Sequence, residues 1–238
     1  MTTTDTSALA SPLQQVALHE PWSVRGEVRE RIRRAIALQQ LPAGARLNQE
    51  QLARQLGVSR MPVRDAINDL IAEDLVTTLP SGGAVVRDLT AADLRAVYDV
   101  RLALELPAVH LVARGGQGQW REELAEILTA QRALAQADER EELHRLDRDF
   151  HWAIYRATGN RFLGRALTPV WSHISRAMFR LLAVESYADI AWAEHSAITE
   201  ALLAGDGDGA AGLMEQHVRN GADRLLQVMD TGRAGAGT

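Results

Sequence analysis

The segment GVSRMPVRDAI, residues 57–67, carries the pattern from which the rest of the fold can be worked out. Ser59 can begin a helix here, because its side chain can accept from first-turn amides. Pro62 is tolerated in that first turn, since those amides have no intrahelical partner. Arg60 and Arg64 are four residues apart and so lie on one face. The opposite face is apolar and consists of Val63, Ile67, Leu70 and Ile71.

Two further helices are predicted upstream of this segment. Apolar residues repeat every four positions from Val24 to Ile36, with arginines between them, which predicts an amphipathic helix with a basic outer face. The arginines in question are Arg25, Arg29, Arg33 and Arg34. That helix should end before Pro42, and Asn48 followed by Gln51 resembles a capping box for a short second helix. The second helix should end at Gly57, which makes it the first half of a helix-turn-helix pair.

A β-hairpin is predicted downstream. Residues 75–78 read as a strand, 80–83 as a turn and 84–86 as a second strand. Three helices and a hairpin within about 65 residues are the outline of a winged helix-turn-helix domain, which we place at 23–88 after a flexible tail at 1–22.

The rest of the chain is predicted to be entirely helical. Thr90 to Asp93 can cap a long helix, and further helical segments are expected at 118–136, 138–157, 161–185, 187–204 and 207–229. The fold is therefore expected to be mainly α. A winged helix-turn-helix is followed by an all-α bundle of six to seven helices over 89–230 and a second flexible tail at 231–238.

Charge and composition divide the chain in the same way. The net charge is −5, but residues 24–88 hold ten Arg against eight acidic residues, whereas 89–238 hold sixteen Arg against twenty-one. A basic front half and an acidic back half indicate two different roles. The absence of Cys excludes disulfides and thiolate metal sites. We see neither a secretory signal nor a membrane span, so a cytoplasmic protein is expected.

The helix that begins at Ser59 has the residue types that read DNA. Its N-terminal end is the end that meets base edges in a helix-turn-helix, and Arg side chains can bond guanine O6 and N7 together. Ser59 and the free amides near it can hold a phosphate. The alternative is that Arg64 pairs with Asp65, Asn68 or Asp69 on a solvated surface.

This half of the chain resembles the winged-helix domain of the GntR family of bacterial transcription regulators. The resemblance runs from LPAGARLNQEQLARQLGVSRMPVRDAINDLIAEDLV, residues 41–76, through GGAVV at 82–86. It implies that Arg46, Ser59, Arg60, Arg64 and the wing-tip Gly83 contact DNA, together with Met61, which replaces the usual Thr. The wing lacks the usual basic residues.

Three histidines and one aspartate in the second half lie within or beside apolar helical stripes. Asp147 and His151 are four residues apart, so both can reach one ion, and His195 and His217 lie in two later stripes. Three nitrogens and one oxygen suit zinc first, and also nickel or another first-row divalent ion. Each histidine taken alone is more often an ordinary core histidine, so a polar core cluster remains the alternative.

The second half also resembles a known domain, the FCD effector domain of the FadR subfamily of GntR regulators, with the helix count of the VanR-type branch. The resemblance is carried by LDRDFHWAIYRATGN (146–160), EHSAITEALLAGD (194–206) and MEQHV (214–218). It implies that Asp147, His151, His195 and His217 are metal ligands.

Arg101 is the candidate effector-binding residue. It lies beside an apolar stripe, and a buried guanidinium needs an anion. Glu105, four residues later, is one possible partner, and a carboxylate of a bound ligand is the other. The family resemblance implies small organic acids as ligands.

These observations together favour a ligand-responsive repressor and not an enzyme. A homodimer would place two recognition helices on a near-palindromic double-stranded operator, and a carboxylate metabolite would reduce its affinity. A metal-dependent enzyme built on the bundle is the first alternative, but no second carboxylate is expected to act as a base. The second alternative is a regulator whose metal site is purely structural.

Overall fold

The structure is a computed structural model that describes residues 24–134, 139–182, 184 and 186–235. The predicted tail at 1–22 lies outside the described residues, as do 236–238. The chain divides into two compact units, one ending at Leu89 and the other beginning at Thr90.

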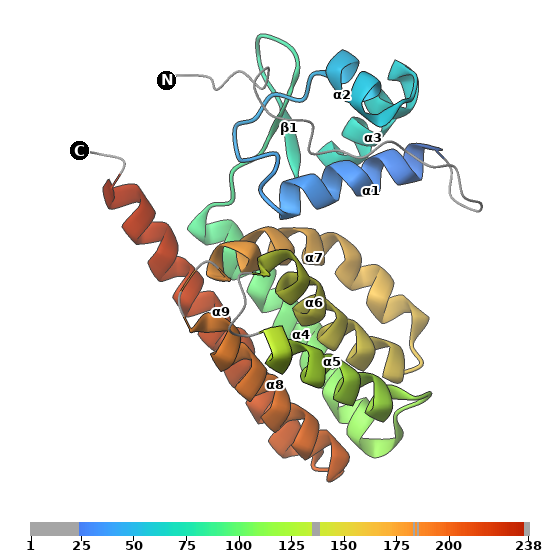
Figure 1. The fold of residues 1–238 in the computed structure, drawn as a ribbon, viewed down its shortest axis with the longest axis vertical. Helices are drawn as coiled ribbons and strands as arrows, with labels where there is room; N and C mark the ends of the chain where they lie inside the picture. The colour runs from blue at the N-terminus through green and yellow to red at the C-terminus, as the bar shows by residue number, and fades with distance from the viewer. Residues whose placement is uncertain (1–23, 135–138, 183, 185, 236–238) are drawn as a thin grey trace. The chain divides into compact units, whose positions relative to one another are not determined.

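Over residues 24–89, the first unit contains three helices followed by an antiparallel hairpin, as predicted (Figure 1). Val76 pairs with Val86 and Thr78 with Ala84, and Arg46 adds an antiparallel bridge to Val85. This arrangement is a winged helix-turn-helix. Its elements are α1 (Val24–Ala37), α2 (Gln49–Leu56), α3 (Arg60–Ala72), β1 (Val76–Thr78) and β2 (Ala84–Val86).

The predicted apolar stripes form the core of this unit. Val28 and Ile32 of α1 pack in one cluster with Leu56 of α2 and with Val63 and Leu70 of α3. Local signals set the helix ends: Asn48 accepts hydrogen bonds from the amides of Glu50 and Gln51, and Gly57 ends α2 in the left-handed region, with φ 67°.

The basic outer face expected for α1 is only partly present. Arg33 is buried, because its guanidinium bonds Glu73 at the end of α3, at 2.8 Å, and also Glu30. Arg25 pairs with Asp69 of α3. Arg29 lies 3.9 Å from carboxylate oxygens of both Asp69 and Glu73. Three of the four arginines therefore join α1 to α3, a role that the spacing within α1 does not indicate.

The second unit consists of six helices in the part of the chain that the structure describes (Figure 1). A capping box begins the first: the Thr90 hydroxyl accepts from the amide of Asp93, and the Asp93 carboxylate accepts from the amide of Thr90. The helices are α4 (Ala91–Gly115), α5 (Trp120–Leu134), α6 (Arg140–Ala157), α7 (Arg161–Leu181), α8 (Tyr187–Leu203) and α9 (Gly207–Gly235). The last helix therefore extends into the stretch predicted to be a tail.

The packing of the bundle brings distant parts of the sequence together. α4 packs along α9 and α7, α8 packs between α9 and α5, and α6 lies against α5 and α7 (Figure 1). Polar residues from α4, α6, α8 and α9 consequently meet in the interior of the unit. Within the described residues, none of the helices has the length and apolar character that crossing a lipid bilayer requires.

Candidate metal centre and nucleic-acid interface

The first turn of α3 presents the residues predicted to read DNA on an exposed surface. Ser59, Arg60, Met61 and Arg64 are all exposed, and the apolar Met61 side chain is 63% exposed. Ser59 occupies the N-cap position but makes no side-chain cap bond, contrary to the capping role expected from the sequence. Its hydroxyl is therefore not committed to α3 itself.

The alternative partners suggested for Arg64 do not bury it. Its Nε lies 3.7 Å from an Asp65 carboxylate oxygen, and both side chains are more than one-third exposed. Asp69, another of the alternatives, pairs with Arg25 and Arg29 of α1. A surface ion pair of this length contributes little free energy, so Arg64 remains available for an outside partner.

Arg46 lies beside the hairpin, and Gly83 lies in its turn. Arg46 is exposed and bridges to the middle of β2 at Val85. Gly83 has φ +94° and follows Gly82, with φ +83°, in the tight turn of the wing. Positive φ at both positions explains why the wing tip uses glycine.

The four residues predicted as metal ligands come together in the interior of the second unit. Asp147 and His151 of α6, His195 of α8 and His217 of α9 each offer one donor atom, and these atoms all lie within 4.8 Å of one another. All four residues are buried, with at most 3% exposure. Donor atoms around one divalent ion lie roughly 3–4 Å apart, given metal–ligand distances of about 2.0–2.2 Å. Small side-chain rotations would therefore close this cluster around an ion.

An outer layer of acceptors orients the three imidazoles. Each Nδ1 lies against an oxygen from a different helix: His151 against Glu105 of α4 at 2.9 Å, His195 against Gln131 of α5 at 3.1 Å, and His217 against Glu194 of α8 at 2.7 Å. Carboxylate and amide oxygens accept hydrogen bonds, so each Nδ1 donates. A neutral imidazole that donates from Nδ1 keeps its lone pair on Nε2, so all three rings are set to coordinate through Nε2.

Two donor atoms of the cluster have no hydrogen-bond partner among the described residues. They are Nε2 of His195 and Oδ1 of Asp147, which are buried and 3.7 Å apart. Burial also lowers the pKa of all three histidines and raises the pKa of Asp147 to about 6. Unpaired buried polar atoms cost free energy, and a cation bound between them would remove that cost. The donor set therefore fits a divalent metal ion.

Arg101 lies at the edge of this cluster and is 1% exposed. Its Nε donates to Glu105 at 2.5 Å, and its Nη2 lies 2.7 Å from Nε2 of His151. Its guanidinium also lies over the ring of Trp171, 5.2 Å from the centroid. The ion pair raises the pKa of Arg101 and lowers that of Glu105, so both stay charged. Glu105, the partner within the protein suggested for Arg101, is thus present. It also lies against Nδ1 of His151, a predicted metal ligand.

Sequence reasoning missed most of this outer layer. Glu105 is predicted from the sequence only as a partner of Arg101, and neither Gln131 nor Glu194 is predicted to belong to the site. Glu194 accepts from both His217 and Asn220 of α9 and so holds the His217 ring in place. Pairing between helices at these positions leaves no periodic signal in the sequence.

A winged helix followed by an all-helical bundle with a buried polar cluster is the architecture of a transcription regulator that senses a ligand. Two family models match the chain in the same order. The model described as "Bacterial regulatory proteins, gntR family" matches residues 25–86, and the "FCD domain" model matches residues 96–220. The second match alone covers more than half of the chain.

Comparison with individual proteins agrees with these matches. The chain is 32% identical to the "Probable D-xylose utilization operon transcriptional repressor" of Paenarthrobacter nicotinovorans, covering 82% of this chain and 86% of that protein. It is 30% identical to the "Nta operon transcriptional regulator" of Aminobacter aminovorans, covering 78% and 87%. Among solved structures, E. coli McbR/YncC has the same fold, with a TM-score of 0.79 at 24% identity, covering 88% of this chain and all of that one.

The chain belongs to the GntR family of transcriptional regulators and has an FCD effector-binding domain as its second unit. Its family, relatives and structural neighbours are regulators and not enzymes, as the sequence predicted.

Proposed function

We propose that the effector domain holds a divalent metal ion through Asp147, His151, His195 and His217. The observation that carries this proposal is the pair of buried, unpartnered atoms on Asp147 and His195, within a cluster whose three imidazoles all donate from Nδ1 to outer acceptors. Zinc is the first candidate, with nickel or another first-row ion as alternatives, since histidine and carboxylate ligands suit several of them. The ion would supply a Lewis-acid position for one oxygen of a small organic acid.

Arg101 is the residue that we propose binds the effector carboxylate. A guanidinium has five N–H donors in a planar fork, and Glu105 engages the one on Nε. Nη2 lies beside His151, so a carboxylate held by Arg101 would lie next to the proposed ion. This proximity supports a ligand that contacts both groups.

The proposed output is the release of DNA. Two subunits would place their α3 helices in successive major grooves of a near-palindromic operator, with base or backbone contacts from Arg46, Ser59, Arg60, Met61, Arg64 and Gly83. Effector binding would favour a packing of the bundle in which the two DNA-binding units no longer match the half-site spacing. A coupling of about 1–3 kcal/mol reduces affinity roughly 5- to 150-fold, which is enough for control of transcription.

A purely structural metal site is the second candidate. It is favoured by the fact that the proposed ligands come from α6, α8 and α9, so one ion would cross-link three helices. The two functions differ at Arg101, because a structural site does not need a buried cation beside it. Under the regulatory proposal, operator release by an organic acid depends on Arg101, whereas under the structural one nothing at Arg101 affects the response.

Metal analysis tests the proposal directly. Protein purified without chelator or nickel resin should contain about one divalent ion per chain, and the His151→Ala variant should lose it. His144→Ala is the matched control, since His144 is another buried histidine of α6 but lies outside the cluster. A wild-type protein that remains without metal after zinc and nickel are offered would contradict the proposal, as would equal loss in both variants.

A further inference from the structure

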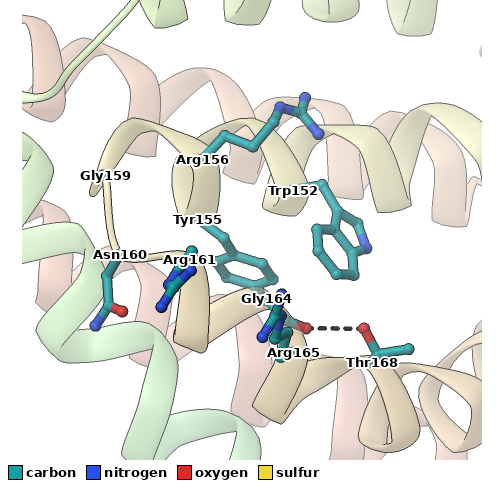
Figure 2. Close-up of a pocket in the computed structure, with 9 residues that line it drawn as sticks. All are labelled: Trp152, Tyr155, Arg156, Gly159, Asn160, Arg161, Gly164, Arg165 and Thr168. Atoms are coloured by element: carbon teal, nitrogen blue, oxygen red, sulfur yellow. Dashed lines mark hydrogen bonds between the residues drawn. The ribbon is translucent and has the colours of Figure 1, made fainter.

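The proposed effector site is closed to solvent, so a ligand needs a way in. Arg101 and the four clustered residues are all buried. A hollow of about 430 Å³ lies beside them at the corner between α6 and α7 (Figure 2). Its lining includes Trp152, Tyr155 and three arginines. None of the predicted site residues lines this hollow, and neither the proposed metal nor the proposed effector site accounts for it.

The charge around the hollow suits an anion. Arg156, Arg161 and Arg165 line it, and the first turn of α7 contains no acidic residue to offset the positive end of that helix. Arg156 pairs with Glu123, while the guanidinium groups of Arg161 and Arg165 lie 4.7 Å and 6.0 Å from the ring centroid of Phe162. A basic cluster at the mouth of a hollow raises the local concentration of small anions.

Tyr155 separates the hollow from the candidate metal centre. Asp147, His151 and Tyr155 follow one another at steps of four along α6, about 6 Å apart, so they share one face. The Tyr155 ring lines the hollow and lies 6.5 Å from the ring of His151 and 6.4 Å from that of Trp171. Trp171 in turn contacts both His151 and Arg101. One aromatic side chain therefore divides the basic hollow from the place where the effector would bind.

Two glycines near Tyr155, Gly159 and Gly164, allow the chain to pack closely around the hollow. Gly159 ends the turn after α6 with φ +69°. Gly164 of α7 lies under the Trp152 ring, where an added Cβ would approach Cζ3 to 2.8 Å. The absence of a side chain at Gly164 leaves room for the Trp152 ring, which lies beside the Tyr155 ring with centroids 5.7 Å apart, so both rings line the hollow (Figure 2).

We propose that this hollow is the entrance through which small carboxylate anions reach Arg101 and the metal centre, and that the Tyr155 ring is its movable inner wall. Arg161 and Arg165 draw the anion to the mouth, and rotation of Tyr155 admits it. The inference rests on the proposed function, because it gives the route to that same site.

Chelators that remove zinc from the loaded protein can test this route, since they must reach the ion from outside. Pyridine-2,6-dicarboxylate is a small planar dianion, whereas 1,10-phenanthroline is planar and neutral. The rate of zinc removal by the dianion should rise with the concentration of the dianion. In R161Q/R165Q that rate should be at least fivefold lower than in the wild type, while the rate of removal by phenanthroline should be unchanged. R121Q/R132Q alters two arginines of α5 that also lie over aromatic rings, and it should leave both rates as in the wild type.

Variants of Tyr155 test the inner wall. Tyr155→Ala should speed zinc removal by both chelators at least tenfold, whereas Tyr155→Phe, which keeps the ring, should not. If Tyr155→Ala fails to fold, the arginine pair still decides the question. The proposal is overturned if R161Q/R165Q slows both chelators equally or neither, or if removal does not depend on chelator concentration. A wild-type protein that binds no zinc would overturn the proposed function and this inference together, whereas bound zinc with unchanged rates overturns the inference alone.

Discussion

Removing one member of the buried Arg101–Glu105 pair should destabilise the effector domain far more than removing the charge of both. Arg101→Met leaves the Glu105 carboxylate uncompensated at a position with no solvent exposure. Breaking a buried pair in this way costs about 3–5 kcal/mol. The double variant R101M/E105Q has no unpaired charge, and its amide oxygen can still accept from Nδ1 of His151.

The double variant should lose only the remaining contacts of the guanidinium. These are the contact of Nη2 with Nε2 of His151 and the positions over Tyr98 and Trp171, at 5.6 Å and 5.2 Å from the ring centroids, the latter worth about 0.5–2 kcal/mol each. We therefore expect the double variant to lose about 1–2 kcal/mol, and the single variant to be less stable than it by about 2–3 kcal/mol. That difference changes the folding equilibrium constant roughly 30- to 150-fold.

Urea denaturation followed by tryptophan fluorescence measures this difference, in chelator so that metal does not contribute. Trp120, Trp152, Trp171 and Trp192 all lie in the effector domain, and a Trp22→Phe background removes the one tryptophan outside it. Equal stability of the single and double variants would refute the ion-pair argument. It would also mean that Arg101 is held by packing and not by Glu105.

Three further outcomes are expected. Glu194→Ala should weaken zinc affinity about 10- to 100-fold, while Glu194→Gln, which keeps an acceptor for His217, should stay near the wild-type value in a competition assay. Arg64→Ala should cost about 1–3 kcal/mol of affinity for a selected operator and relax its preference at one base pair, as measured by fluorescence anisotropy. Asp69→Asn should destabilise the winged-helix unit at pH 7 and by less at pH 2. Its hydrogen bond from Arg25 lowers the folded-state pKa below the usual 3.8, so the stabilisation is present above that value and is lost as the pH falls through the folded-state pKa. Circular dichroism in urea at both pH values would show the difference.

Features encoded within one segment could be predicted from the sequence. The ends of α2 follow from Asn48 and Gly57, the start of α4 follows from Thr90 and Asp93, and the shared face of Asp147 and His151 follows from helical spacing. Each of these depends on residues that are close in the chain. The physics involved is local, so no knowledge of packing is needed.

Features that depend on contacts between helices could not be predicted in this way. Arg33 has the spacing of an exposed residue, yet Glu73, forty residues later, makes it a buried one. Gln131 and Glu194 acquire their roles only because α5, α8 and α9 bring them to histidines on other helices. The joining of His195 and His217 to Asp147 was inferred from family resemblance, since spacing alone cannot place three helices around one point.

The position of Arg101 in the chain suggests how binding in the bundle could reach the DNA-binding unit. Arg101 and Glu105 lie on α4, which begins at the Thr90 cap, directly after the residue that ends the first unit. Eleven residues of continuous helix separate Arg101 from Thr90, or about 16 Å at 1.5 Å per residue. A helix transmits displacement along its axis with little loss, because its backbone hydrogen bonds make it stiff. Under the proposed function, an effector that shifts Arg101 relative to His151 would act on the helix that directly follows the winged-helix unit in the chain, which gives the proposed coupling a direct covalent route.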